Sequence, residues 1–253
     1  MARRRFFVPG IRRGGAELTG REAEHLVRVL RAEPGQIHEI SDNRDLYLAE
    51  IDVARKSLVS FRVLEKLDTP APAVQVCLLA ALIKFERFEW LIEKATELGV
   101  SAIQPIETIR TEKGLAKAAH QRRSRWEKIA LEASQQSRRA HLPRVELPFR
   151  LERCTQIDAS VRLMLDESSG APPILGCLPQ ERKASDHVAL LLGPEGGWTD
   201  QEREWASGEG WTGCSLGPNV LRTETAGLAA LAVIQAAWAP QRPEPDAPPP
   251  EQP

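Results

Sequence analysis

Two glycine turns in the C-terminal half carry the residue types best suited to chemistry. The first, LLGPEGGWTDQE (residues 191–202), leads from an apolar segment through Gly193, Gly196 and Gly197 into a helix start, with Glu195 inside the turn. Glycines let a ligand approach the backbone closely. The spacing fits neither a P-loop nor a G-x-G-x-x-G motif, and a carboxylate in the loop repels phosphate. The turn therefore favours a cation or a hydrogen-bond donor as ligand.

The second turn, LGPNVLRTETAGLAAL (residues 216–231), repeats this arrangement with a Gly-Pro turn, Asn219, Arg222 and Glu224. Ligands of open parallel sheets bind at the carboxyl ends of the strands. Two Gly-Pro turns after successive strand signals, each with a charged residue, therefore predict one composite site. An isolated Gly-Gly pair is most often only a tight turn, so the hypothesis rests on the two turns together.

The elements that must position these turns alternate between strand and helix signals. The expected strands are 73–83, 101–107, 161–167, 187–193 and 213–217, and the expected helices are 85–99, 121–137, 199–207 and 223–239. Such alternation predicts an α/β domain with a mostly parallel sheet. Thr199 and Glu202 have the spacing of a capping box at the start of the third helix.

The N-terminal part has a different pattern. Strand signals at 5–10, 35–42, 46–54 and 57–67 surround one helix at 22–31, which is typical of a small β-barrel. The proline-containing segment 68–73 is typical of a linker. We therefore expect a β-barrel domain over 1–70, an α/β domain over 71–240 and a disordered proline-rich tail over 241–253.

Bulk composition indicates an ordinary soluble protein. The 253 residues are 42% hydrophobic and 27% charged, and the apolar runs are too short to cross a membrane. The four cysteines are scattered without a C-x-x-C pair, so neither a metal site nor a disulfide framework is expected. We therefore predict a cytoplasmic protein without a membrane segment or a bound metal.

Positive charge gathers in two blocks although the whole chain has a net charge of −1. Residues 1–31 hold eight arginines against three glutamates, a balance of +5, and residues 110–144 hold ten lysines or arginines against three glutamates, a balance of +7. Two basic blocks in a neutral protein are typical of a surface for a polyanion, although either block alone could be solvated surface.

The last predicted helix is apolar on nearly every side, with Gln235 as its clearly polar residue. A helix of this kind must be buried all round. One solution is to pack one face on the sheet and the other on a second subunit, which predicts a homodimer. A monomer with an unusually central last helix is the alternative.

The paired turns closely resemble the signature of the SPOUT RNA methyltransferases, in the branch that methylates N3 of a uridine in 16S ribosomal RNA of the small subunit. HLVRVLR, EWLIEKATELGV, IRTEK and RWEKIALEASQQSRR support the resemblance, which covers nearly the whole chain up to the tail. Two departures are SDNR (41–44), where relatives often carry an Asp-Gly turn, and Phe85, where glycine is common after Lys84. Both departures lie outside the glycine turns.

The resemblance implies a PUA-like RNA-binding β-barrel followed by an α/β SPOUT domain with a trefoil knot, in a homodimer that uses S-adenosyl-L-methionine (SAM). Alternation alone could not predict the knot, because knotted chains are rare. By motif matching, the cofactor contacts are expected at Leu165, Leu192, Gly193, Gly197, Leu216, Gly217, Asn219 and Leu221.

For the implied reaction, the proton on uracil N3 must leave before or during methyl transfer. We expect Arg222 to stabilise the negative charge that develops on the base, because its donor fork has a fixed geometry. Glu195 is the candidate general base. An equally weighted alternative is that Glu195 only orients Arg222 or caps the turn, and Glu224 is a second candidate base.

The basic blocks would then contact RNA, either 16S rRNA or the assembled small subunit. The candidate contacts are Arg3, Arg4, Arg5, Arg28, Arg31, Lys84, Arg110, Arg138 and Arg139. Two rival functions stay open: a ribosome-assembly protein with a vestigial cofactor pocket, and a small-molecule α/β enzyme that uses a nucleotide. Intact glycine turns disfavour the first, and missing phosphate motifs disfavour the second.

Overall fold

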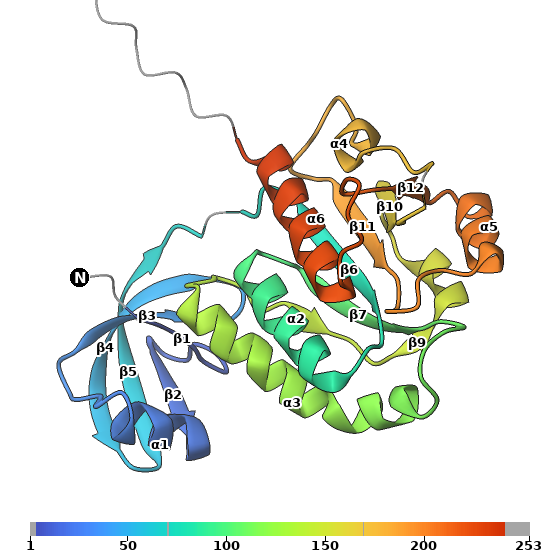
Figure 1. The fold of residues 1–253 in the computed structure, drawn as a ribbon. Helices are drawn as coiled ribbons and strands as arrows, with labels where there is room; N and C mark the ends of the chain where they lie inside the picture. Colours follow the sequence, from blue (N-terminus) through green and yellow to red (C-terminus); the bar gives the residue numbers. More distant parts are fainter. Residues whose placement is uncertain (1–3, 70, 169, 241–253) are drawn as a thin grey trace, which may run out of the picture.

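The computed structural model describes residues 4–69, 71–168 and 170–240, so Arg3 and the tail 241–253 lie outside the described residues. Two sheets organise the chain (Figure 1). Within the described ranges, no helix is long and apolar enough to cross a membrane.

The first sheet has five strands in the order β1-β3-β4-β5-β2, all antiparallel except for the β1–β3 pair. Helix α1 packs on this sheet, and the apolar faces of both form one hydrophobic cluster around Phe6, Leu18, Leu26, Ile51 and Phe61. The elements are β1 (Arg5–Phe7), β2 (Gly15–Thr19), α1 (Gly20–Arg28), β3 (Ile37–Ser41), β4 (Leu46–Arg55) and β5 (Leu58–Leu67).

The second sheet has seven strands, every recorded pair parallel, in the order β12-β10-β11-β6-β7-β8, with β9 also paired to β7. This confirms the α/β class with a parallel sheet. Its strands are β6 (Gln75–Ala81), β7 (Ala102–Glu107), β8 (Arg144–Val145), β9 (Phe149–Arg150), β10 (Val161–Leu165), β11 (His187–Leu192) and β12 (Thr212–Cys214).

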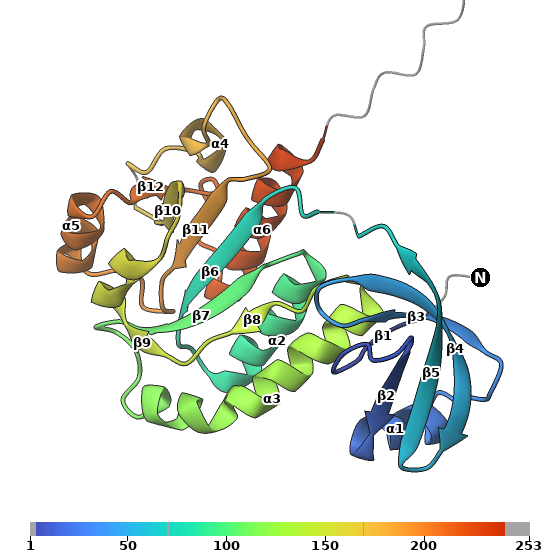
Figure 2. The same cartoon turned by 180° about the vertical axis from the view of Figure 1, so that it is seen from behind.

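Helices cover both faces of this sheet (Figures 1 and 2). Alternate residues of β11 supply the two faces: Leu190 joins the cluster under α2, α3 and α6, and Leu191 joins the cluster under α5 and η1. The helices are α2 (Phe85–Glu97), α3 (Leu115–Gln136), η1 (Leu151–Gln156), α4 (Ile174–Cys177), α5 (Asp200–Gly208) and α6 (Thr223–Trp238).

Some elements differ from the sequence-based expectation. Helix α3 begins at Leu115 rather than near residue 121, after Gly114 with φ of 90°, because the alanine-rich segment LAKAAH has high helix propensity despite its weak periodicity. Strands β2, β8 and β9 were not predicted. They are at most five residues long, and so short an alternation gives little signal.

The two sheets meet where the loop after α3 contacts the turn between β3 and β4. The Ser41 hydroxyl donates to the Ala140 carbonyl at 2.6 Å, and the Leu142 amide donates to the Asn43 side chain at 2.7 Å. Arg138 pairs with Glu39 at 2.9 Å. The C-terminal end of α3 is therefore fixed to the first sheet.

Candidate functional site

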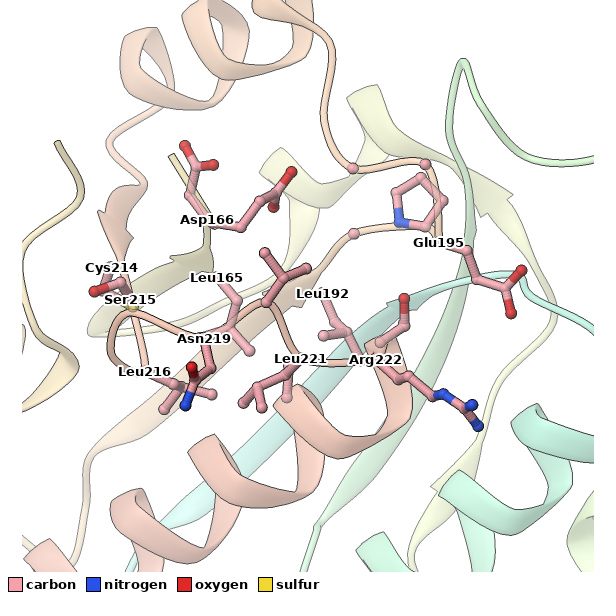
Figure 3. Close-up of a pocket in the computed structure, with 18 of the residues that line it drawn as sticks. Leu165, Asp166, Leu192, Glu195, Cys214, Ser215, Leu216, Asn219, Leu221 and Arg222 are labelled. Carbon is pink, nitrogen blue, oxygen red and sulfur yellow. The ribbon is translucent and has the colours of Figure 1, made fainter. Parts of the chain in front are cut away.

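The two glycine turns enclose one cavity of about 460 Å³ at the carboxyl ends of β10, β11 and β12 (Figure 3). We call it the loop pocket. Ten residues predicted from sequence all line it: Leu165, Leu192, Gly193, Glu195, Gly197, Leu216, Gly217, Asn219, Leu221 and Arg222. The composite site expected from two successive strand ends is therefore formed, with the end of β10 as its third side.

The first turn is held by its own helix and by its neighbours. Thr199 and Glu202 form the predicted capping box at the start of α5. The Trp198 indole is buried and donates to the Leu165 carbonyl at 2.7 Å, which joins this turn to the end of β10. A Cβ on Gly193 would lie 2.9 Å from the Trp198 ring. Glycine is therefore required there by the packed indole.

Gly197 has a different reason to be glycine. Its φ is 70°, in the left-handed region, and a Cβ there would overlap the Glu167 carboxylate. Glu167 lies at this edge because it follows β10 by two residues, and it also lines the pocket. The glycine therefore permits both the turn and the close approach of a carboxylate.

Glu195 and Arg222 lie on the same side of the pocket (Figure 3). Among the described residues, however, no ion pair joins them. The Glu195 carboxylate pairs with Arg87, in the first turn of α2. The Arg222 side chain is exposed and has no recorded hydrogen bond within the described ranges. The Arg222 guanidinium is therefore exposed at the edge of the loop pocket.

Glu224, the other candidate base, does not line the pocket. It lies in the first turn of α6 with 6% of its surface exposed. Its Oε2 is buried without a hydrogen-bond partner among the described residues. The geometry therefore supports Glu195 over Glu224 as the group that faces a ligand.

Three lining residues that sequence reasoning did not select are charged: Arg87, Asp166 and Glu167. Asp166 is buried and receives hydrogen bonds from Arg203 at 3.0–3.2 Å. Burial alone would raise the pKa of Asp166, but the hydrogen bonds from Arg203 and Ser168 lower it below its ordinary value of 3.8. The two acidic residues are the last two of the expected strand 161–167, so strand-end position could have identified them. Arg87 belongs to no motif.

The candidate RNA contacts fall into two groups. Arg4, Arg28, Arg31, Lys84, Arg110 and Arg138 are exposed. Arg5 is largely buried against Glu39, and Arg139 donates to the main-chain carbonyls of Thr96, Val100 and His141. For Arg5 and Arg139 the structure thus supplies internal partners that fix the chain. RNA contact stays a prediction for both groups.

Arg110, one of the exposed candidate RNA contacts, also contacts the first glycine turn. Its guanidinium donates to the Gly196 carbonyl and, at 3.3 Å, to the Trp198 carbonyl. It therefore holds the first glycine turn in place from the loop after β7.

Within the described residues, no group of three or more His, Cys, Asp or Glu side chains could hold a metal ion.

The chain is similar to known proteins. Residues 69–235 match the family model described as an RNA methyltransferase domain. The chain is 34% identical to "Ribosomal RNA small subunit methyltransferase E" of Bacillus subtilis over 86% of this chain and 88% of that protein, and 34% identical to the protein of that name from Synechocystis over 87% and 72%.

Solved structures agree with this match. A putative methyltransferase from Legionella pneumophila, solved with bound SAM, superposes with a TM-score of 0.84 at 30% identity and covers 94% of this chain and 98% of that one. The ribosomal RNA small subunit methyltransferase E from Neisseria gonorrhoeae, solved with S-adenosyl methionine, gives 0.80 at 28% identity and the same coverage. The glycine-turn pocket, the family model and these relatives together establish that the chain belongs to the RNA methyltransferase family, with relatives named ribosomal RNA small subunit methyltransferase E.

Proposed function

We propose that this protein uses SAM to methylate N3 of a uridine in 16S rRNA of the small ribosomal subunit. The observation that carries the proposal is that ten residues expected from the family motifs converge on the loop pocket from separate strand ends. The names of the relatives and the SAM bound in two of the matched structures supply the substrate class and the cofactor.

The residues of the loop pocket fit SAM. Its volume of about 460 Å³ lies within the usual range of small-molecule sites, about 300–1,000 Å³. Leu165, Leu192, Leu216 and Leu221 offer apolar surface for the adenine ring. Three carboxylates, those of Asp166, Glu167 and Glu195, line the cavity and complement the positive charges of a sulfonium and an ammonium group.

Bound SAM supplies an electrophilic methyl group on its sulfonium sulfur. The chain's own residues must position the uracil and manage the proton that N3 loses. We assign to Arg222 the stabilisation of negative charge spread over the uracil oxygens, because its guanidinium lines the pocket and has no hydrogen-bond or ion-pair partner among the described residues. Glu195 accepts the N3 proton directly or through water. Its pairing with Arg87 places its carboxylate on the pocket side that Arg222 also occupies.

The wider organisation belongs to the same proposal. In this proposal, residues 1–70 form a PUA-like RNA-binding β-barrel, and residues 71–240 form a SPOUT domain with a trefoil knot. Separate hydrophobic clusters in the two parts support this division.

A homodimer is supported by the outer face of α6, where Thr225, Ala232 and Ala236 are exposed. An rRNA substrate is consistent with action in the cytoplasm.

The decisive experiment is mass spectrometry of small-subunit rRNA from a strain that lacks this protein. We expect one N3-methyluridine to disappear and to return on complementation with the intact chain, but not with Arg222→Ala. Unmethylated 16S rRNA and small subunits from the deletion strain, each offered to the purified protein with SAM, identify the form of the substrate. If every methylated uridine persists in the deletion strain, the proposal is wrong.

A further inference from the structure

A second cavity of about 390 Å³ lies at the carboxyl end of β7, outside the loop pocket. We call it the Phe149 pocket. Its lining includes one aromatic side chain and several charged or polar groups: Phe149, Glu107, His120, Arg150, Glu152 and Arg153. None of these residues takes part in the reaction described above, and their roles are unassigned.

The two cavities are connected by a short segment of chain. Glu107 is the last residue of β7 and lines the Phe149 pocket. Two residues later, the Ile109 amide donates to the Glu202 carboxylate at 2.8 Å, and Arg110 contacts the carbonyls of the first glycine turn. Because β7 is parallel to the other strands, both cavities open at the same edge of the sheet.

The Phe149 pocket combines a stacking surface with cations. The Arg153 guanidinium lies over the Phe149 ring, 5.4 Å from its centroid. Arg150 and Arg153 form no ion pair with any described residue, and neither does Lys117, one helical turn before His120 on α3. Aromatic rings and arginine planes stack on unpaired bases, and free cations neutralise phosphates. The glutamates and His120 can bond to polar base edges.

Helix α3 relates this cavity to the first sheet (Figures 1 and 2). Its C-terminal end leads into the loop that contacts the turn between β3 and β4, and its N-terminal half contributes His120 to the cavity. A helix of this length spans about 33 Å. An RNA strand held by the first sheet can therefore follow α3 to the carboxyl edge.

We propose that the Phe149 pocket binds an unpaired nucleotide of the RNA substrate that neighbours the methylated uridine, with its base stacked against Phe149 and Arg153. This inference rests on the proposed function, because it requires an RNA substrate at the loop pocket. It assigns the cavity a part in choosing the sequence around the target.

The test is steady-state methylation of unmethylated small subunits by Phe149→Leu and Arg153→Gln. Leucine keeps the apolar packing of the phenyl ring and removes its stacking face. The matched control is Arg182→Gln, which removes an exposed arginine outside both basic blocks, in the loop before β11, where its guanidinium lies 5.8 Å from the centroid of the Trp238 ring. We expect the KM for subunits to rise about ten-fold in both pocket variants. The SAM dissociation constant and kcat stay unchanged, and the control behaves as wild type.

A second measurement does not depend on substitutions. Unmethylated 16S rRNA containing 4-thiouridine is irradiated with the wild-type protein, and crosslinked peptides are identified by mass spectrometry. We expect a crosslink within 145–157, the segment that carries Phe149 and Arg153. If the wild-type enzyme methylates normally but KM is unchanged in Arg153→Gln and no crosslink forms in this segment, the pocket inference is wrong and the proposed function stands. A wild-type protein that methylates no rRNA overturns both.

Discussion

The Glu195 carboxylate in the first glycine turn forms its ion pair with Arg87 of α2, and not with Arg222 of the second turn. The pair links the turn after β11 to the helix after β6, and both residues line the loop pocket. The role of orienting Arg222 therefore lacks a contact among the described residues, and proton transfer by Glu195 stays a prediction.

The Arg87–Glu195 pair is half exposed, with 38% and 41% of the two side chains accessible. We expect a double-mutant cycle of Arg87→Gln and Glu195→Gln to give a coupling of about 0.2–1 kcal/mol in the free energy of unfolding, measured by urea denaturation. The activity changes should be unequal: Glu195→Gln should lower kcat more than Arg87→Gln does, because glutamine cannot take a proton. An unaltered kcat in Glu195→Gln would remove Glu195 as the base.

Arg222→Ala should lower kcat by about 10²–10³-fold with little change in SAM affinity, because a single charge-stabilising donor group is lost. Since its side chain has no internal partner among the described residues, the melting temperature should stay within a few degrees of wild type. Arg222→Lys keeps the charge without the planar fork and should recover only part of the activity. Equal turnover of Arg222→Ala and wild type would contradict this assignment.

Gly193→Ala should weaken SAM binding at least ten-fold by calorimetry and destabilise the fold by about 1–3 kcal/mol. The added methyl group would displace the Trp198 ring, which lies 2.9 Å from its position, and would break the indole hydrogen bond to Leu165. Gly213→Ala on β12 is the control, because its Cβ would meet no atom within 4 Å. If both variants bind SAM as wild type does, the packing argument fails.

Asp166 should stabilise the fold in a pH-dependent manner. Its folded-state pKa is below 3.8, so its contribution is fully present above that pH and is lost as the pH falls through the folded-state pKa. We expect Asp166→Asn to cost about 1–3 kcal/mol at neutral pH and the difference from wild type to shrink below pH 3.8. Asp200 also pairs with Arg203, but its side chain is 97% exposed. As the control, Asp200→Asn should therefore change the free energy of unfolding by less than about 0.5 kcal/mol. A difference for Asp166→Asn that is independent of pH would show that Arg203 does not set its pKa.

Ala232→Glu places a charge on the exposed face of α6. If this face is covered by a second subunit, the substitution should convert a dimer into a monomer, as measured by light scattering after gel filtration, because a buried unpaired charge is costly. Ala118→Glu, on α3 rather than α6, serves as the control. A wild-type protein that is monomeric at micromolar concentration would contradict the proposed dimer.

Local sequence determined most of the loop pocket. The glycine turns, the capping box of α5 and the apolar strands before them depend on near neighbours in the chain, so motif and periodicity predict them. The two-sided hydrophobic pattern of β11 likewise predicts a strand buried between helices.

Contacts between distant residues were decided by the tertiary structure. Arg87 and Glu195 are 108 residues apart, and no local pattern pairs them. Arg139 belongs to a basic block of the kind that contacts polyanions, yet its guanidinium donates hydrogen bonds to main-chain carbonyls of other segments. The Phe149 pocket combines α3 with the two-residue β9, which is too short to give a signal. Sequence thus determined which turns could bind a ligand, whereas only the fold decided which charges are free to meet it, because charge pairing depends on side chains that the chain brings together from far apart.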